Sequence, residues 1–334
     1  MRFAAGRDDW LGALDRAIAG APRDARLHAI KLWALHRAGL GEACRAVLAE
    51  ATASCGDAPE LLGRAALIAT EHGTREEADA AFARLDPLAD AETTVSWLRH
   101  LLRRGEPERI AASPPRLAGA ARDAAWPYLS LAWRLTGDPR AEWLDDPRLV
   151  RAIDLPFTPA EIAALVGALR ALHVTHSRPL DQSVRGGTQT EGPLLSRIDP
   201  VIAILRDRLR TAVAGYVAAL PSPDPRHPLL GRIPREPRFQ GAWSVRLTGG
   251  GYHEPHVHGE GWLSSAFYVA LPGVGAEAGA LTLGAPQTTL ATSLPPRATL
   301  DPTVGRLVLF PSTLWHGTLP FPAGERLTVA FDIA

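Results

Sequence analysis

Three histidines lie within six positions in the stretch Gly250-Gly251-Tyr252-His253-Glu254-Pro255-His256-Val257-His258, directly after the alternating segment 243–247. Alternation of apolar and polar residues predicts a β-strand, because successive side chains of a strand point to opposite faces. If the strand geometry continues, His256 and His258 project to the same side, since residues i and i+2 share a face. Two imidazoles on one side are half of a metal site, and His316 is the candidate for the other half.

The composition limits the class of protein. The chain has 334 residues, 46% of them hydrophobic, which is enough for two domains with ordinary buried cores. The formal net charge is zero, so no strong field favours nucleic acid or an anionic membrane as a partner. Two cysteines, Cys44 and Cys55, exclude a disulfide scaffold and suit a reducing compartment. Residues 1–9 turn acidic where a signal peptide would become apolar, and no apolar run is long enough to span a bilayer. We therefore expect a cytoplasmic protein with no membrane partner.

Residues 1–150 carry a repeat of helical character. Apolar residues recur at helical spacing, and turn glycines separate the helices at intervals of 34, 32 and 32 residues: Gly39, Gly73, Gly105 and Gly137. A period near 34 with paired helices is typical of tetratricopeptide repeats, whose stacked pairs bury a common core. We therefore expect a tetratricopeptide-like domain over 1–150, with a concave surface of the kind that binds peptides or partner proteins. A generic helical bundle is the alternative.

Residues 151–334 combine supporting helices with strands. Thr158-Pro159-Ala160-Glu161 predicts a helix start, with threonine as the N-cap and glutamate three positions later. A second helix is expected from Pro200 to about Leu220. From Phe239 onward, short strands separated by turn residues indicate an antiparallel barrel or jelly roll: 266–271, 279–284, 305–311 and 326–331. The expected fold class is thus α+β multidomain, with an all-α repeat followed by a jelly roll.

The order of the candidate site residues resembles a known enzyme family. His256 and His258 are followed by His316, and Arg326 and Thr328 come about ten positions after His316. This order resembles the iron(II)- and 2-oxoglutarate-dependent oxygenases, whose double-stranded β-helix is a jelly roll. The sequence is similar to bacterial oxygenases fused to tetratricopeptide repeats, strongly over 150–334 and more loosely in the repeats. The stretches that carry the similarity are 182–190, 243–247, 261–269 and 309–318.

The resemblance implies a set of cofactors and of residues that hold them. Iron(II) would be bound by the three candidate histidines, with positions left open for 2-oxoglutarate and O₂. Arg326 would bind the far carboxylate of 2-oxoglutarate in a bidentate way, Thr328 would add a hydroxyl donor, and Tyr268 is assigned to the same cofactor-binding site. The family couples decarboxylation of 2-oxoglutarate, to succinate and CO₂, with hydroxylation of a bound C–H group.

One position departs from the common form of the family. Most such oxygenases carry Asp or Glu where this chain has His258. Three neutral imidazoles leave the metal charge uncompensated and favour other metals such as zinc. Three alternatives therefore stay open: His253 replaces one ligand, or Glu254 or Glu260 supplies a carboxylate.

Further residues are candidates for contact with substrate. The polar stretch 180–192 would ordinarily be a solvated loop, but its similarity to the family places it at the mouth of the barrel. Arg246 is expected either to pair with an acid or to contact substrate, and Trp262 either to pack in the barrel or to form a substrate wall. The full candidate set is Gln182, Arg185, Thr188, Gln189, Arg246 and Trp262.

The sequence thus favours a hydroxylase that acts on a peptide or protein side chain presented by the helical repeats. A three-histidine dioxygenase of cupin type that does not use 2-oxoglutarate is a second hypothesis, against which Arg326 and Thr328 argue. A third is an interaction protein whose repeats act while the barrel is inert. A small-molecule substrate, with repeats that serve only for homodimerisation, is a further possibility.

Overall fold

The chain forms two compact units, which we describe separately. The computed structural model describes residues 9–174 and 183–334. The first unit comprises the described residues up to Thr136 together with Thr289–Thr292, and the second unit comprises the other described residues from Gly137 onward. Gln182 lies outside the described residues. Within the described ranges, none of the helices has the length and apolar character that a membrane crossing requires.

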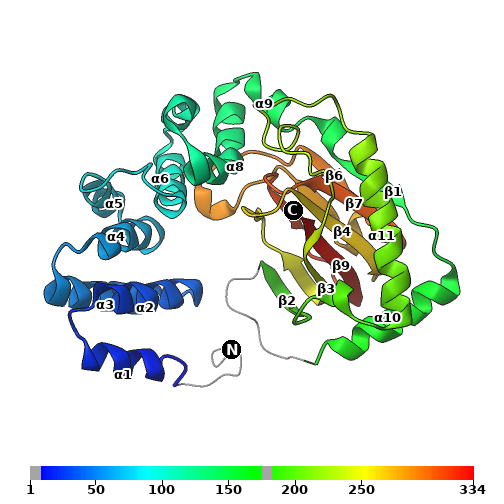
Figure 1. The fold of residues 1–334 in the computed structure, drawn as a ribbon, viewed down its shortest axis with the longest axis horizontal. Helices are drawn as coiled ribbons and strands as arrows, with labels where there is room; N and C mark the ends of the chain where they lie inside the picture. The colour runs from blue at the N-terminus through cyan, green and yellow to red at the C-terminus, as the bar shows by residue number, and fades with distance from the viewer. Residues whose placement is uncertain (1–8, 175–182) are drawn as a thin grey trace. The chain divides into compact units, whose positions relative to one another are not determined.

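The first unit is entirely helical. Its helices are α1 (Gly12–Gly20), α2 (Ala25–Arg37), α3 (Gly41–Cys55), α4 (Pro59–His72), α5 (Arg75–Phe82), α6 (Ala91–Arg104), α7 (Pro107–Ala111) and α8 (Gly119–Thr136) (Figure 1). The predicted turn glycines each follow a helix, since Gly39 and Gly137 come just after α2 and α8, and Gly73 and Gly105 cap α4 and α6. Gly39, Gly105 and Gly137 have φ of 73°, 72° and 69°, a left-handed backbone that glycine adopts without strain.

Neighbouring helices in this unit pack pairwise. Helix α4 contacts α2 and α3 on one side and α5 and α6 on the other. A partly buried ionic group joins α4 to α6, because the Glu71 carboxylate accepts from Arg99 at 2.6 Å and from Arg103 at 2.7 Å. The helical nature of the N-terminal half is confirmed, while its assignment to the tetratricopeptide class stays a prediction.

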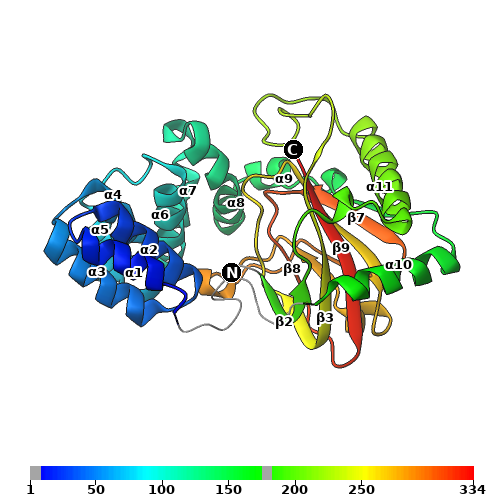
Figure 2. The ribbon, with the colours of Figure 1, turned by 60° about the horizontal axis from the view of Figure 1, so that its bottom comes forward.

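The second unit contains two antiparallel sheets and covering helices. The large sheet has the order β1-β7-β4-β9-β3-β2 and the small sheet has the order β6-β5-β8 (Figures 1 and 2). The strands are β1 (Arg151–Asp154), β2 (Val184–Gln189), β3 (Phe239–His253), β4 (Leu263–Ala270), β5 (Leu281–Leu283), β6 (Ala298–Leu300), β7 (Arg306–Pro311), β8 (His316–Thr318) and β9 (Glu325–Ile333). The helices are α9 (Arg140–Leu144), α10 (Pro159–Leu172) and α11 (Pro200–Ala218). This arrangement is consistent with the expected jelly roll.

The two faces of the large sheet have different partners. One face packs against α10 and α11 in a core that includes Leu169, Leu205 and Phe331. The other face packs against the small sheet, through a cluster in which Tyr268 and Phe310 meet Leu283. Alternate residues of each strand therefore belong to different environments, as the pleat of a sheet requires. We refer to these as the helical face and the inner face of the large sheet.

The polar stretch expected at the mouth of the barrel is partly a strand. Residues 184–189 form β2, which pairs with β3 in the large sheet. Its register shifts between Arg185 and Gly187, and Gly186 has a φ of 69°. A Cβ on Gly186 would lie 3.0 Å from the Gly251 Cα, so this irregularity requires glycine.

The predicted helix start and C-terminal strands are confirmed. Thr158 and Glu161 form a reciprocal capping box at α10, and the expected segments lie in β4, β5, β7 and β9. The extension of the strand through the histidine stretch is wrong, because β3 ends at His253. Pro255 has no amide hydrogen to donate to a ladder, so regular pairing stops there.

Candidate metal centre

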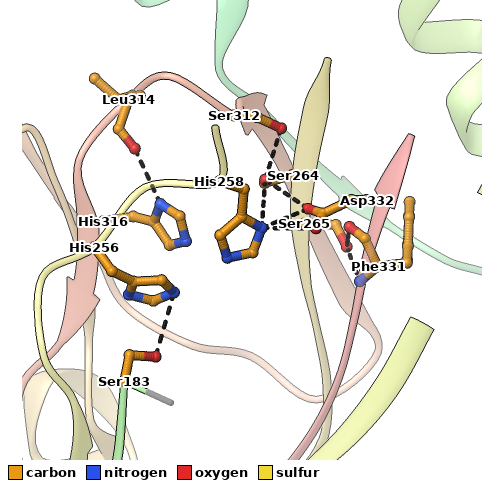
Figure 3. Close-up of polar contacts among 10 residues, drawn as sticks. All are labelled: Ser183, His256, His258, Ser264, Ser265, Ser312, Leu314, His316, Phe331 and Asp332. Carbon is orange, nitrogen blue, oxygen red and sulfur yellow. Dashed lines mark hydrogen bonds and ion pairs between the residues drawn. The ribbon is translucent and has the colours of Figure 1, made fainter. Parts of the chain in front are cut away.

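Three imidazoles from two distant segments meet on the inner side of the second unit. His256 and His258 follow β3, and His316 begins β8. One ring nitrogen from each residue lies within 4.8 Å of those of the other two. The ring centroids are 4.2 Å apart for His256 and His316, 5.1 Å for His256 and His258, and 5.0 Å for His258 and His316 (Figure 3). We call this group the histidine triad.

The backbone fixes the positions of the triad without help from the side chains. His256 and His316 exchange two backbone hydrogen bonds, each 2.9 Å long, and so form an isolated antiparallel bridge. The amide of His258 donates to the Ser312 carbonyl at 3.0 Å. The two segments that carry the rings are therefore tied together on both sides of Val257.

Hydrogen bonds also orient the rings. The Nδ1 atom of His256 lies 2.8 Å from the Glu254 carbonyl oxygen, and that of His316 lies 3.0 Å from the Leu314 carbonyl oxygen. A carbonyl oxygen only accepts, so Nδ1 must carry the proton in both rings and Nε2 keeps its lone pair. The Nδ1 atom of His258 lies 2.7 Å from both carboxylate oxygens of Asp332, with the same consequence. All three rings thus offer Nε2 as the donor.

Burial keeps His256 and His316 in the form that binds metals. Burial lowers the pKa of His256 to about 4, and it lowers the pKa of His316 well below 6.5. The neighbouring histidines lower both pKa values further, because a second positive charge nearby is unfavourable. These rings are therefore neutral near pH 7, as coordination to a metal ion requires. Three imidazole nitrogens that converge within 4.8 Å of one another fit a divalent transition ion.

The other candidate ligands have different roles. His253 ends β3, and its Nδ1 is 3.0 Å from the Ser183 hydroxyl, which also lies 3.3 Å from Nε2 of His256. The Glu254 carboxylate forms an ion pair with Arg185. Glu260 is exposed. Among residues 9–174 and 183–334, the metal-binding group contains none of these three side chains.

Arg326 is buried on the inner face without an acidic partner. Its relative exposure is 2%, and its Nε atom has no hydrogen-bond partner among the described residues. None of the ion pairs found in the described part of the chain involves Arg326. Burial lowers the pKa of its guanidinium, as expected where the charge lacks full compensation. A buried charge of this kind is costly unless a ligand of opposite charge completes it.

The remaining cofactor candidates surround Arg326. Its Cζ atom lies 5.2 Å from the centroid of the Tyr268 ring, and Tyr268 is itself fully buried. Thr328 pairs with Tyr268 across β4 and β9, and it shares the inner face with Arg326 because two positions separate them. The structure therefore brings the three predicted cofactor-binding residues together.

The candidate substrate residues are distributed over both faces of the large sheet. Gln189 pairs with Val245, which belongs to an inner cluster. Thr188 pairs with Arg246, whose guanidinium forms an ion pair with Glu325. Arg185 forms the ion pair with Glu254 described above. The Trp262 indole lies on the helical face and donates a hydrogen bond to the Leu229 carbonyl at 2.9 Å. Arg246 is thus paired with an acid and Trp262 packs on the helical face, while contact of either residue with substrate stays a prediction.

A buried histidine supports Thr188 and gives a prediction on pH. Nε2 of His173 lies 3.1 Å from the Ser244 hydroxyl, which itself donates to the Thr328 carbonyl, so Nε2 carries the proton and Nδ1 accepts from Thr188 at 2.9 Å. Burial lowers the pKa of His173 from 6.5 to about 4. As the pH falls, the unfolded chain therefore takes up a proton at a higher pH than the folded chain does. The free energy of unfolding falls as the pH drops from 6.5 to about 4.

The expected loss can be measured against a variant that does not titrate. Relative to His173→Gln, the wild-type protein should lose about 2 kcal/mol of unfolding free energy between about pH 7.5 and about pH 5. Urea unfolding followed by circular dichroism at both pH values measures this difference. An equal change in both proteins would contradict the prediction.

Three residues that adjoin the triad were not among the candidates predicted from the sequence. Asp332, Ser264 and Ser183 each form a hydrogen bond to a triad ring. The sequence could have indicated Asp332, because alternate residues of β9 share a face and Asp332 lies on the same face as Arg326 and Thr328. Ser183 and Ser264 carry no comparable signal.

The comparisons with known proteins agree with this geometry. Residues 241–332 match a family model described as "Putative 2OG-Fe(II) oxygenase". The match contains the triad, Arg326, Thr328 and Asp332. A search of curated proteins found no match.

Several solved structures are similar to part of the chain. HygX from Streptomyces hygroscopicus with nickel and 2-oxoglutarate bound is 16% identical, with 58% of this chain and 85% of HygX covered and a TM-score of 0.39. A Pseudomonas putida prolyl-4-hydroxylase is 16% identical, with 55% and 91% covered and a TM-score of 0.38. AviO1 from Streptomyces viridochromogenes Tue57 is 16% identical, with 60% and 94% covered and a TM-score of 0.37.

Proposed function

We propose that the second unit is an iron(II)- and 2-oxoglutarate-dependent oxygenase that hydroxylates a peptide or protein side chain. The observation that carries the proposal is the combination of two features in one unit. Three imidazoles converge, and a buried guanidinium lies on the inner face of the adjoining sheet without an acidic partner among the described residues. The match of residues 241–332 to the oxygenase family supports the same reaction class.

Each residue of the centre has a defined task in this proposal. His256, His258 and His316 would hold the ion through Nε2, while their Nδ1 protons keep the rings oriented. Iron(II) with 2-oxoglutarate and O₂ supplies the oxidation of a C–H group, with succinate and CO₂ as products. Arg326 would bind the far carboxylate of 2-oxoglutarate through two parallel hydrogen bonds. The buried Tyr268 ring and the surrounding apolar cluster exclude water from that ion pair.

A spectroscopic titration tests the reaction class. Anaerobic addition of 2-oxoglutarate to the iron(II)-loaded protein should give a weak visible charge-transfer band near about 500 nm. The same titration of metal-free protein is the control and should give no band. Admission of O₂ should then release succinate. A band-free titration together with no succinate would reject the proposal.

The second candidate is a dioxygenase that binds its metal through three histidines and does not use 2-oxoglutarate. The absence of a carboxylate from the metal-binding group of the described residues favours it. Arg326, which forms no ion pair with the described residues, favours the first candidate, because a reaction without an anionic co-substrate leaves its charge uncompensated. Metal-dependent O₂ consumption without succinate would identify the second candidate. A protein without metal dependence would fit an inert barrel.

The substrate class is a separate part of the proposal. The all-helical first unit, with pairwise packed helices, supports a peptide or protein substrate by analogy with helical repeat proteins. Succinate formation should be stimulated by a macromolecular fraction of cell extract, and protease treatment of that fraction should remove the stimulation. Stimulation by the small-molecule fraction alone would indicate a small-molecule substrate.

A further inference from the structure

Asp332 distinguishes one histidine of the triad from the other two. The Nδ1 protons of His256 and His316 are donated to neutral backbone carbonyls. The Nδ1 proton of His258 is donated to a carboxylate, with both Asp332 oxygens at 2.7 Å (Figure 3). The carboxylate thus lies directly behind the ring whose position holds Asp or Glu in most oxygenases that the chain resembles.

The Asp332 carboxylate is held rigidly. Asp332 lies on β9 and pairs with Ser264 of β4, whose hydroxyl donates to Oδ1 at 2.7 Å. The Ser312 hydroxyl lies 2.8 Å from the Ser264 hydroxyl, and the Ser312 carbonyl accepts from the His258 amide. The Ser312 side chain can pack against the backbone at position 261 only because that residue is glycine, since a Cβ there would lie 2.6 Å from the Ser312 hydroxyl oxygen. Two adjacent strands and a turn therefore position the carboxylate and the ring relative to each other.

No cation pairs with the Asp332 carboxylate among the described residues, apart from the contact with the His258 ring. Among the ion pairs of residues 9–174 and 183–334, Asp332 takes part only in the contact with His258. Its side chain is 16% exposed, so solvent screens the charge only in part. The charge is therefore available to the centre through His258.

We propose that Asp332 is a positioning residue of the metal centre, which fixes the Nδ1–H form of His258 and compensates part of the metal charge through that ring. This inference rests on the proposed metal-binding function of the triad. A carboxylate behind a coordinating imidazole orients the ring and strengthens its donation to the metal. Three imidazoles alone would leave the full double charge of the ion, and Asp332 reduces the sum to one positive charge.

Metal affinity of the full chain tests the proposal without dependence on turnover. Calorimetric titration of metal-free protein with Co²⁺ should show that Asp332→Asn binds about 10–100-fold more weakly than wild type. The matched control is Asp154→Asn, which removes a carboxylate at the edge of the same sheet, where it pairs with Arg306. The control should bind Co²⁺ as the wild type does. Equal affinity of Asp332→Asn and wild type would overturn the proposal.

A second measurement needs no substitution and is insensitive to misfolding of a variant. Imidazole ¹⁵N–¹H spectra of the Zn²⁺-loaded wild-type protein should show His258 protonated at Nδ1. Its proton should resonate further downfield, and exchange more slowly, than those of His256 and His316, because a carboxylate accepts more strongly than a carbonyl. A His258 ring protonated at Nε2 would overturn the inference.

The outcomes separate this inference from the proposed function. Wild-type protein that binds neither Co²⁺ nor Zn²⁺ would contradict the metal centre itself, and Asp332 would lose its role with it. Wild-type binding that Asp332→Asn does not weaken would leave the metal centre in place and reject only the role of Asp332.

Discussion

Replacement of His316 with alanine should lower the metal affinity of the protein by at least about 100-fold and reduce succinate formation to background. His316 is the single donor from the downstream segment, while His256 and His258 come from one short stretch. Two neutral imidazoles without a third retain little of the affinity of the complete group. Calorimetric titration with Co²⁺ measures the binding, and a succinate assay with iron(II) measures the turnover.

His253→Asn is the matched control for this experiment. His253 is a neighbouring, partly buried histidine that stacks on His256 with a centroid distance of 5.9 Å, yet it is not part of the metal-binding group of the described residues. Its replacement should leave the Co²⁺ affinity within about threefold of wild type, as expected for a group that does not coordinate. The opposite pattern, in which His253→Asn loses metal and His316→Ala keeps it, would show that the ligand set is assigned incorrectly.

Replacement of Arg326 with methionine should have opposite effects on stability and on function. The KM for 2-oxoglutarate should rise by about 100-fold or more, because truncation of one partner of a buried charge pair costs several kcal/mol. The thermal midpoint of the ligand-free protein should not fall and is expected to rise, since the variant removes a buried charge that lacks an acidic partner among the described residues. Few substitutions of a fully buried residue have this combination of effects.

Two measurements check this prediction. Thermal unfolding with and without 2-oxoglutarate, in the presence of Mn²⁺, should show stabilisation of the wild type by the ligand and none for Arg326→Met. Arg306→Met, at a partly exposed ion pair on β7, is the control and should keep the response to 2-oxoglutarate. An unchanged KM in Arg326→Met would remove Arg326 from the co-substrate site.

The sequence predicted the convergence of the triad but not the path that leads to it. Spacing alone placed His256 and His258 on one side, and the structure brings them together with His316 although β3 has already ended at His253. The bridge between His256 and His316 replaces the expected strand. Long-range pairing of this kind depends on tertiary contacts, which a local period of two does not encode.

The remaining differences have similar physical causes. Residues 184–189 lack apolar alternation because two adjacent glycines serve a bulge, so the stretch resembled a solvated loop. Arg246 and Trp262 were candidates for substrate contact because they adjoin the motif in sequence. In the structure, each of them contacts a partner far along the chain, which is Glu325 for Arg246 and the Leu229 carbonyl for Trp262.

The backbone bridge between His256 and His316 has a consequence for how this unit can change over evolutionary time. Its two reciprocal hydrogen bonds use only main-chain atoms, so they survive any replacement of the rings except by proline. The side chains that would bind the metal can thus be lost without loss of the backbone contacts that hold the two segments together. A descendant chain that lost these imidazoles would keep the geometry of the two segments, and this architecture can therefore give rise to folded pseudoenzymes by single substitutions.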